Sequence, residues 1–106
     1  MTYHFDNREY DCPFDCFIDI IKGKWRTSLL LELASHPCYF RELQRALPGI
    51  SAKVLTENLQ VLERNQLVVR REHATQPVTV EYALTKNGTH LVGVMRQINQ
   101  WVDSCF

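Results

Sequence analysis

Apolar residues recur at helical spacing in five stretches of the chain and alternate with polar residues in two others. The stretches with helical spacing are residues 12–22, 24–35, 41–47, 51–65 and 85–106. The alternating stretches, residues 67–72 and 78–84, predict two strands, and the residues between them fit a hairpin loop. Proline and glycine separate these elements at Pro13, Gly23, Pro37, Pro48, Gly49, Pro77 and Gly88. The pattern predicts an α+β fold that is mainly α.

The first and last predicted helices each gather their apolar side chains on one side. The apolar face of the first helix consists of Phe14, Phe17, Ile18 and Ile21. The opposite side of the same helix carries Cys12, Asp15, Cys16 and Asp19. The last helix has one continuous apolar stripe, formed by Leu91, Val94, Met95, Ile98, Trp101, Val102 and Cys105.

The stripe on the last helix is long for the core of so small a domain. Part of it can cover the domain's own core, but a helix that extends from the last strand more often pairs with a second copy. We therefore expect a homodimer through residues 12–22 and 85–106. Its predicted interface residues are Phe14, Phe17, Leu91, Met95, Ile98, Trp101 and Val102.

The length of the chain fits a single domain, and its charges are unevenly distributed along the sequence. The 106 residues suffice for a single domain, and twelve basic residues balance twelve acidic ones. Residues 1–21 hold one basic and five acidic residues, whereas residues 22–72 hold nine basic and five acidic ones. An acidic arm over residues 1–11 thus precedes a moderately basic middle, which permits phosphate binding without requiring it. With no membrane-length apolar run and no signal peptide, we expect a cytoplasmic protein that binds no membrane.

The order of the middle elements is helix, short turn with glycine, helix and β-hairpin, which is the order of a winged helix-turn-helix. The turn is Pro48–Ile50, and Ser51 is a good N-cap for the second helix. The second helix of such a pair enters the DNA major groove with its N-terminal residues. We therefore expect base or backbone contacts from the residues at the start and along the polar face of this helix: Ser51, Ala52, Lys53, Thr56 and Gln60.

Basic residues outside that helix complete the predicted contact with double-stranded DNA. Arg41 and Arg45 precede the turn and suit phosphate contacts, although a role in solubility explains them equally well. Arg70 and Arg71 are neighbours on the first strand of the hairpin and so point to opposite faces. At most one of them faces DNA squarely, and the sequence does not show which.

Several short motifs resemble those of the HxlR family of bacterial winged-helix regulators, over about residues 12–101. Cys12-Pro13 opens the first helix, and Ile20–Trp25 resembles the family's I-G-G-K-W signature. Phe40–Leu43 resembles F-x-E-L, and Leu47–Ser51, followed by Leu55, Thr56 and Leu59, resembles L-P-G-I-S. Val80–Thr85 with Gly88 resembles V-E-Y-x-L-T-x-x-G. The resemblance implies a dimeric DNA-binding repressor or activator with a C-terminal dimerisation helix.

The chain departs from the family pattern at three places. Lys22 replaces the first glycine of the signature, and Arg41 replaces a helix-capping Ser or Thr. The wing usually has Pro-Pro-Arg or Pro-Pro-Lys before V-E-Y, but here it reads Gln-Pro-Val-Thr over residues 76–79. The missing base predicts a weaker grip of the wing on DNA.

The resemblance also draws attention to Cys12, because some family members sense electrophiles or oxidants through the cysteine at this position. Cys12 lies at a predicted helix N-terminus, where the helix dipole favours a thiolate, but the carboxylates of Asp11 and Asp15 oppose it. We expect a regulatory thiol with Cys105 of the partner subunit as resolving cysteine and Cys16 as the second choice. The alternative is a capping or packing cysteine.

Other classes of function find little support in the sequence. The four cysteines lack C-x-x-C spacing, so neither a metal site nor a cofactor is expected. No nucleophile elbow, phosphate loop or paired carboxylates suggest an enzyme, and a thiol oxidoreductase using Cys12 and Cys16 is the weakest alternative. A winged helix used only for protein–protein contact is the stronger one, and measured DNA binding separates it from a regulator.

Overall fold

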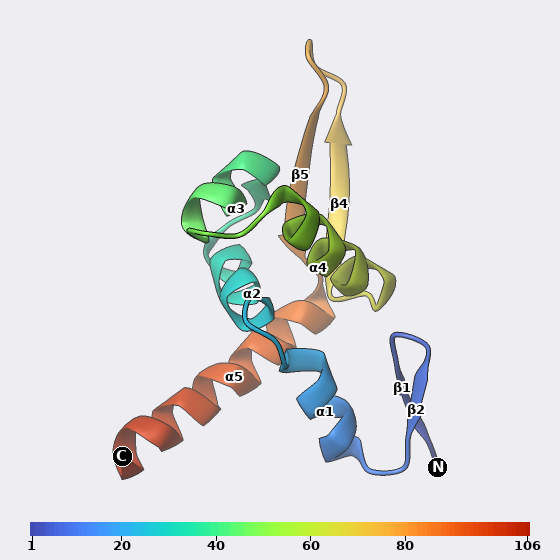
Figure 1. Ribbon diagram of the computed structural model, residues 1–106, viewed down its shortest axis with the longest axis vertical. Helices are drawn as coiled ribbons and strands as arrows, with labels where there is room; N and C mark the ends of the chain where they lie inside the picture. The colour runs from blue at the N-terminus through green and yellow to red at the C-terminus, as the bar shows by residue number, and fades with distance from the viewer.

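A computed structural model describes residues 1–106 as ten short elements around one core (Figure 1). The helices are α1 (Pro13–Ile21), α2 (Arg26–Ser35), α3 (Phe40–Ala46), α4 (Ala52–Arg64) and α5 (Lys86–Cys105). The strands are β1 (Tyr3–Phe5), β2 (Arg8–Tyr10), β3 (Cys38–Tyr39), β4 (Val68–His73) and β5 (Thr79–Leu84). Strands β3, β5 and β4 form an antiparallel sheet in that order, and β4–β5 is the projecting wing. The predicted winged helix-turn-helix is confirmed.

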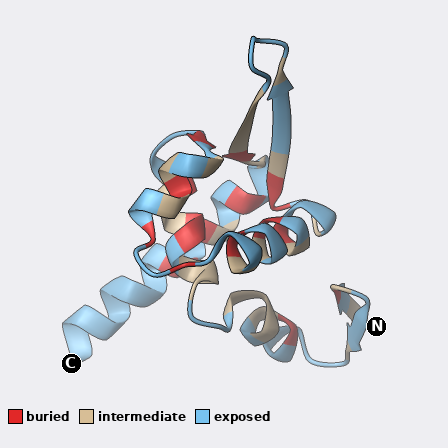
Figure 2. Ribbon diagram, turned by 45° about the horizontal axis from the view of Figure 1, so that its top comes forward, coloured by how far each residue is buried: buried red, intermediate tan, exposed pale blue.

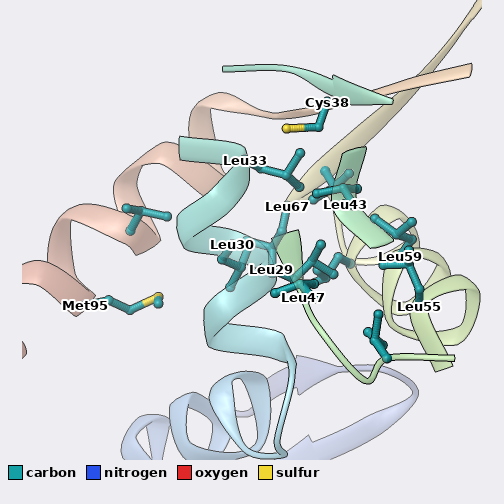
Figure 3. Packing of buried hydrophobic residues seen from close by; sticks show 14 of the residues in the cluster. Leu29, Leu30, Leu33, Cys38, Leu43, Leu47, Leu55, Leu59, Leu67 and Met95 are labelled. Carbon is teal, nitrogen blue, oxygen red and sulfur yellow. The ribbon is translucent and has the colours of Figure 1, made fainter. Parts of the chain in front are cut away.

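The core lies between α2, α3, α4 and the base of the wing, as the close view in Figure 3 shows. Helix α2 is central, since its residues Leu29, Leu30 and Leu33 are all buried. Leucines dominate this core, and those with almost no exposed surface are Leu29, Leu30, Leu43, Leu55, Leu59 and Leu62. Truncating such a leucine to alanine typically costs about 2–5 kcal/mol, so these residues hold α3 and α4 in a fixed relation.

The turn between α3 and α4 is built by local chemistry that the sequence predicts. Gly49 has a φ of +92°, a conformation that other residues rarely adopt, and Ile50 is buried beneath the turn. The Ser51 hydroxyl accepts a hydrogen bond of 3.1 Å from the Val54 N–H, which caps α4. The polar start of α4 is therefore held rigidly.

Helix α5 joins the domain through its first half only. The Thr85 hydroxyl accepts from the Gly88 N–H at 3.0 Å, and a side chain at Gly88 would collide with the Leu67 carbonyl oxygen. Val92 and Met95 then enter the core, so Met95, predicted at the dimer interface, is buried within its own chain with 5% of its surface exposed. Beyond Met95 the helix projects from the body with all its residues exposed (Figure 2).

The N-terminal segment is not a loose acidic arm. Strands β1 and β2 form a two-stranded antiparallel hairpin, turned by Asp6 and Asn7 with φ of +50° and +66°. This hairpin covers α1 on the side that carries Cys16, which is buried at 8% exposure, while Phe14 on the other side is 64% exposed. The side of α1 opposite its apolar face is thus covered in part, because the hairpin supplies apolar residues such as Phe5 to pack against it.

Two departures from the family motifs have local explanations. Lys22 ends α1 with a φ of −69°, which any residue adopts, so a glycine is not required there. The expectation that Arg41 takes a capping position is wrong, because the N-cap of α3 is Tyr39, whose N–H donates to the Glu42 carboxylate at 2.9 Å. In addition, none of the helices combines the length and the apolar character needed to cross a bilayer.

Candidate nucleic-acid interface

Helix α4 presents a polar face away from the core. Leu55, Leu59 and Leu62 anchor its inner side, so the residues between them point outward. The residues predicted to approach DNA from this helix are all exposed: Ser51, Ala52, Lys53, Thr56 and Gln60. The structure therefore brings these five residues together on one surface of the helix-turn-helix.

Three basic residues of the helix-turn-helix have no acidic partner. Arg41 and Arg45 on α3 and Lys53 on α4 are exposed, and none of them takes part in an ion pair. An unpaired surface cation can meet a phosphate without first breaking an internal salt bridge. The two arginines on α3 thus lie ready for the phosphate contacts that the sequence suggests.

A groove of about 760 Å³ runs between α4 and the wing. Its walls come from both elements and comprise Thr56, Leu59, Gln60, Glu63, Arg64, Arg70 and Tyr82. Arg70 therefore faces the polar side of α4. Arg71 lies on the other face of the wing, in a second hollow that the end of α2 and the first half of α5 border. Of the two wing arginines, Arg70 is the one on the candidate DNA side.

The wing arginines are engaged by acidic neighbours. Arg70 donates to Glu72 at 2.8 Å, and this hydrogen bond raises the pKa of Arg70 above its ordinary value. Arg71 lies 3.9 Å from Glu81. The tip between the two strands, residues 74–78, contains no basic residue. A cationic phosphate contact by the wing on the α4 side therefore comes from Arg70 and must compete with Glu72.

Arg64 and Tyr82 are site residues that the sequence reasoning missed. Arg64 follows Gln60 by one helical turn, and Gln60 follows Thr56 by one turn, so helical spacing alone places all three on one face. Tyr82 pairs with Arg70 across the strands. The spacing was sufficient to find Arg64, but the side to which Tyr82 points depends on the register of the hairpin.

Residues 20–106 match the sequence model of the HxlR-like helix-turn-helix family, which is more than half of the chain. The chain belongs to this family. The transcriptional regulator YdeP of Bacillus subtilis is 36% identical over 101 residues, which are 95% of this chain and 78% of YdeP. This HxlR-family chain is a transcriptional regulator with a DNA-binding helix-turn-helix, and its relatives are not enzymes.

Two solved regulators share the fold of this HxlR-family chain. The redox regulator HypR in its oxidised form has a TM-score of 0.80 at 33% identity, over 90% of this chain and 98% of HypR. The reduced form of YodB from B. subtilis has a TM-score of 0.81 at 32% identity, over 91% of this chain and 95% of YodB. YodB has also been solved with quinone bound.

The four thiols of this HxlR-family chain differ in accessibility. Cys12 and Cys105 are exposed, whereas Cys16 and Cys38 are buried. Burial raises the pKa of both the Cys16 and the Cys38 thiols, with a smaller effect of nearby carboxylates in the same direction. The two buried thiols are therefore poor nucleophiles, and Cys16 is less suited to a sensing role than the sequence suggests.

Cys12 occupies the position that the sequence predicts, at the N-cap of α1 and before Pro13. Its side chain makes no capping hydrogen bond, so the thiol is not engaged by the helix. Two lysines at the end of α1, whose positive charges would stabilise a thiolate nearby, are engaged elsewhere: Lys22 pairs with Asp19 at 3.0 Å, and Lys24 lies over the Trp25 ring at 4.8 Å. Two features of Cys12 favour a reactive thiol: its exposure and its place at the N-terminus of α1.

Proposed function

We propose that this HxlR-family regulator binds a palindromic operator in duplex DNA as a homodimer. Each α4 enters a major groove, with Lys53, Thr56 and Gln60 at the base edges and Arg41 and Arg45 on the phosphates. The observation that carries the proposal is the exposed polar face of α4, flanked by unpaired cations and pinned by a leucine core. In a symmetric dimer the two half-sites lie about one helical turn of DNA, roughly 34–36 Å, apart.

The exposed apolar surface of α1 and α5 supports the dimer. Ile98, Trp101 and Val102 on the projecting half of α5 are 40%, 61% and 41% exposed. A small apolar hollow of about 170 Å³ lies beside Ile98, where α1, α2 and α5 meet. A contiguous apolar surface of this kind marks a protein interface in a folded domain. A second copy would cover it with the same residues and generate the two-fold symmetry that a palindrome requires.

Selection of bound sequences from a random duplex pool tests the DNA-binding proposal directly. The expected result is an inverted repeat whose half-site spacing matches two α4 helices on one face of the duplex. Enrichment of no sequence, together with equal affinity for all duplexes, would contradict it and favour a winged helix used for protein contact.

The same proposal includes regulation through Cys12. The Cys12 sulfur would add to a ring carbon of a quinone, so that a C–S bond forms as a ring C=C π bond breaks, and the thiol proton ends on a quinone oxygen to give a hydroquinone thioether. A two-electron oxidant such as an azo compound would instead take two electrons and two protons from Cys12 and a second thiol, leaving a disulfide. The exposed Cys105 of the partner subunit is the proposed second thiol. In a single chain, Figure 1 and Figure 2 show the start of α1 and the end of α5 well apart.

Either modification would change the angle between the two α4 helices and release the operator. The test compares operator binding by wild type and Cys12→Ser after treatment with a quinone or a mild oxidant, with Cys38→Ser as a matched control at a buried thiol. Wild type and Cys38→Ser should lose affinity, and Cys12→Ser should keep it. An equal response of Cys12→Ser and wild type would make Cys12 structural.

A further inference from the structure

The N-terminal hairpin contacts both the helix that begins at Cys12 and the helix proposed to read DNA. On the α1 side, the Tyr10 hydroxyl donates to the Asp19 carboxylate at 2.6 Å, and Arg8 lies 3.8 Å from the same carboxylate. The pKa of Asp19 is lowered mainly by the hydrogen bond from Tyr10 and next by that from Lys22, which lies 3.0 Å away. Strand β2 and α1 are therefore joined by a side chain that remains charged.

On the α4 side, the turn of the hairpin meets the end of the helix. The Asp6 N–H donates to the Asn65 side-chain oxygen at 2.9 Å, and the Asp6 carboxylate accepts from Arg64 at 2.7 Å. Asn65 is the C-cap of α4 and donates its own amide to the Val61 carbonyl at 2.7 Å. Two adjacent residues at the end of α4 are thus held by a single turn residue.

A packed joint keeps the hairpin in place between these two contacts. Phe5 is buried at 6% exposure, and the Arg26 guanidinium lies 5.8 Å from the centre of its ring. Arg26 also donates to the carbonyls of Asp19 and Ile20 at 3.1 and 3.2 Å. The hairpin, the end of α1 and the start of α2 therefore meet at one side chain, and a displacement of α1 cannot leave the hairpin unmoved.

The charge of Asp6 and its hold on the end of α4 should affect DNA binding in opposite directions. Arg64 lines the groove between α4 and the wing, so the Asp6 charge beside it opposes any phosphate that enters. The same residue holds the last turn of α4, where Arg64 lies one helical turn beyond Gln60 and two beyond Thr56. Loss of the charge would strengthen contact with any duplex, whereas loss of the positioning would weaken only the operator.

We propose that Asp6 is a positioning residue for α4, and that the hairpin through which it acts carries the state of Cys12 to the DNA-reading surface. Cys12 follows β2 by two residues and begins α1, so a group or a bond at its sulfur displaces both. The hairpin lies outside the residues 20–106 that match the family model. The second half of the proposal rests on the proposed regulation through Cys12.

The first test compares Asp6→Asn with Glu9→Gln on the selected operator and on a random duplex. Asparagine tolerates the left-handed φ of position 6 and keeps the backbone donor, so the turn can form. Glu9 is an exposed carboxylate of the same hairpin that forms no ion pair, which makes Glu9→Gln a matched control for charge. Circular dichroism establishes that each variant is folded.

Positioning predicts that Asp6→Asn binds the operator up to about fivefold more weakly, while its affinity for the random duplex is unchanged or raised. Glu9→Gln should leave the ratio of the two affinities as in wild type. An Asp6→Asn variant that binds both duplexes more tightly, or both as wild type does, overturns the positioning role. If Asp6→Asn fails to fold, Asn65→Ala, which removes the side-chain acceptor of the Asp6 N–H and leaves the pair of Asp6 with Arg64, takes its place with the same expectation.

The second test asks whether the hairpin carries the signal from Cys12. In a Cys105→Ser background, which leaves Cys12 as the one exposed thiol, N-ethylmaleimide is added with and without Asp6→Asn. Alkylation should reduce operator affinity in the background protein and have a clearly smaller effect in Asp6→Asn. An equal effect in both overturns the hairpin route but leaves Cys12 regulation standing. No effect in the background protein overturns regulation by alkylation at Cys12 and the route with it, while the first test still decides the role of Asp6.

Discussion

Helix α4 and the projecting half of α5 are both helical surfaces that a single chain leaves exposed, and they differ in chemistry. On α4 the exposed positions are polar and include Lys53, Thr56 and Gln60. On α5 beyond Met95 large apolar side chains are exposed, with Trp101 at 61%. Water solvates the α4 surface readily. Covering the α5 surface with a partner stabilises the complex by about 25 cal/mol for each Å² of apolar area removed from water.

The difference shows which part of the proposed function each helix supports. A polar face held by buried leucines has a rigid geometry and suits recognition of hydrogen-bonding base edges. An apolar face without support from its own domain suits a second copy of the chain. The two surfaces lie at different parts of the molecule in Figure 1, so variants can alter one without the other.

The largest expected effect comes from placing a charge on the α5 surface. Ile98→Asp would bury an unpartnered carboxylate in the dimer, at a cost of several kcal/mol, and should give a folded monomer that loses its palindromic site. Sedimentation and circular dichroism measure mass and fold. Gln97→Asp, at an exposed polar neighbour, is the matched control and should remain a dimer. A well-folded dimer carrying Ile98→Asp would remove α5 from the interface.

The next effect concerns the α4 surface. Lys53→Ala and Thr56→Ala should each weaken binding to the operator by about 1–3 kcal/mol and weaken binding to random DNA much less. Base-edge contacts exist only with the correct sequence. Glu57→Gln, at an exposed carboxylate of the same helix, should instead raise affinity for both duplexes. Equal losses on operator and random DNA from Lys53→Ala and Thr56→Ala would show phosphate contact without base reading. Titration with labelled duplexes measures the affinity of wild type and of each of the three variants for operator and for random DNA.

A smaller effect separates the two faces of the wing. The slope of log affinity against log salt should correspond to about 4–8 phosphates per dimer. Neutralising Arg70 and Arg71 together should flatten it. Arg70→Gln alone should account for most of the change, because Arg70 lines the groove of α4 and Arg71 lies on the other face. A slope unchanged in the double variant excludes the wing from phosphate contacts.

Helical periodicity predicted most of the fold because the features concerned are local. The cap at Ser51, the cap at Thr85 and the turn at Gly49 depend on residues within a few positions of each other. Gly88 needs the tertiary structure for its explanation, since the group that excludes a side chain there is the Leu67 carbonyl.

The hairpin of residues 3–10 escaped prediction because its strands have three residues each, which is too short for an alternating pattern to stand out. Because the hairpin was not predicted, its packing over the cysteine side of α1 was not predicted either. Periodicity shows which residues share a face but not which face the rest of the chain covers. Met95 illustrates the same limit, because one apolar stripe on α5 serves the core up to Met95 and solvent or a partner beyond it.

The smallest expected effect is a pH dependence of the stability to urea, which arises from the ion pair of Asp6 with Arg64 at the end of α4. Arg64, by hydrogen bonding, lowers the pKa of Asp6 below its ordinary value of 3.8. A carboxyl group whose pKa is depressed by folding contributes stability above its unfolded pKa and loses that contribution as the pH falls through the folded value. Wild type should therefore be more stable to urea than Asp6→Asn near neutral pH, and the difference should shrink below pH 3.8.

The α5 surface provides the contrast for this measurement, since its projecting half has no ion pair to titrate. The dissociation constants of the wild-type and Asp6→Asn dimers should therefore agree at every pH at which both are folded. A difference in urea stability that persisted unchanged into acid would assign the effect of Asp6→Asn to the turn backbone. A difference that disappears as the carboxyl group is protonated assigns it to the ion pair with Arg64, so that titration of one side chain reports how the end of α4 is held.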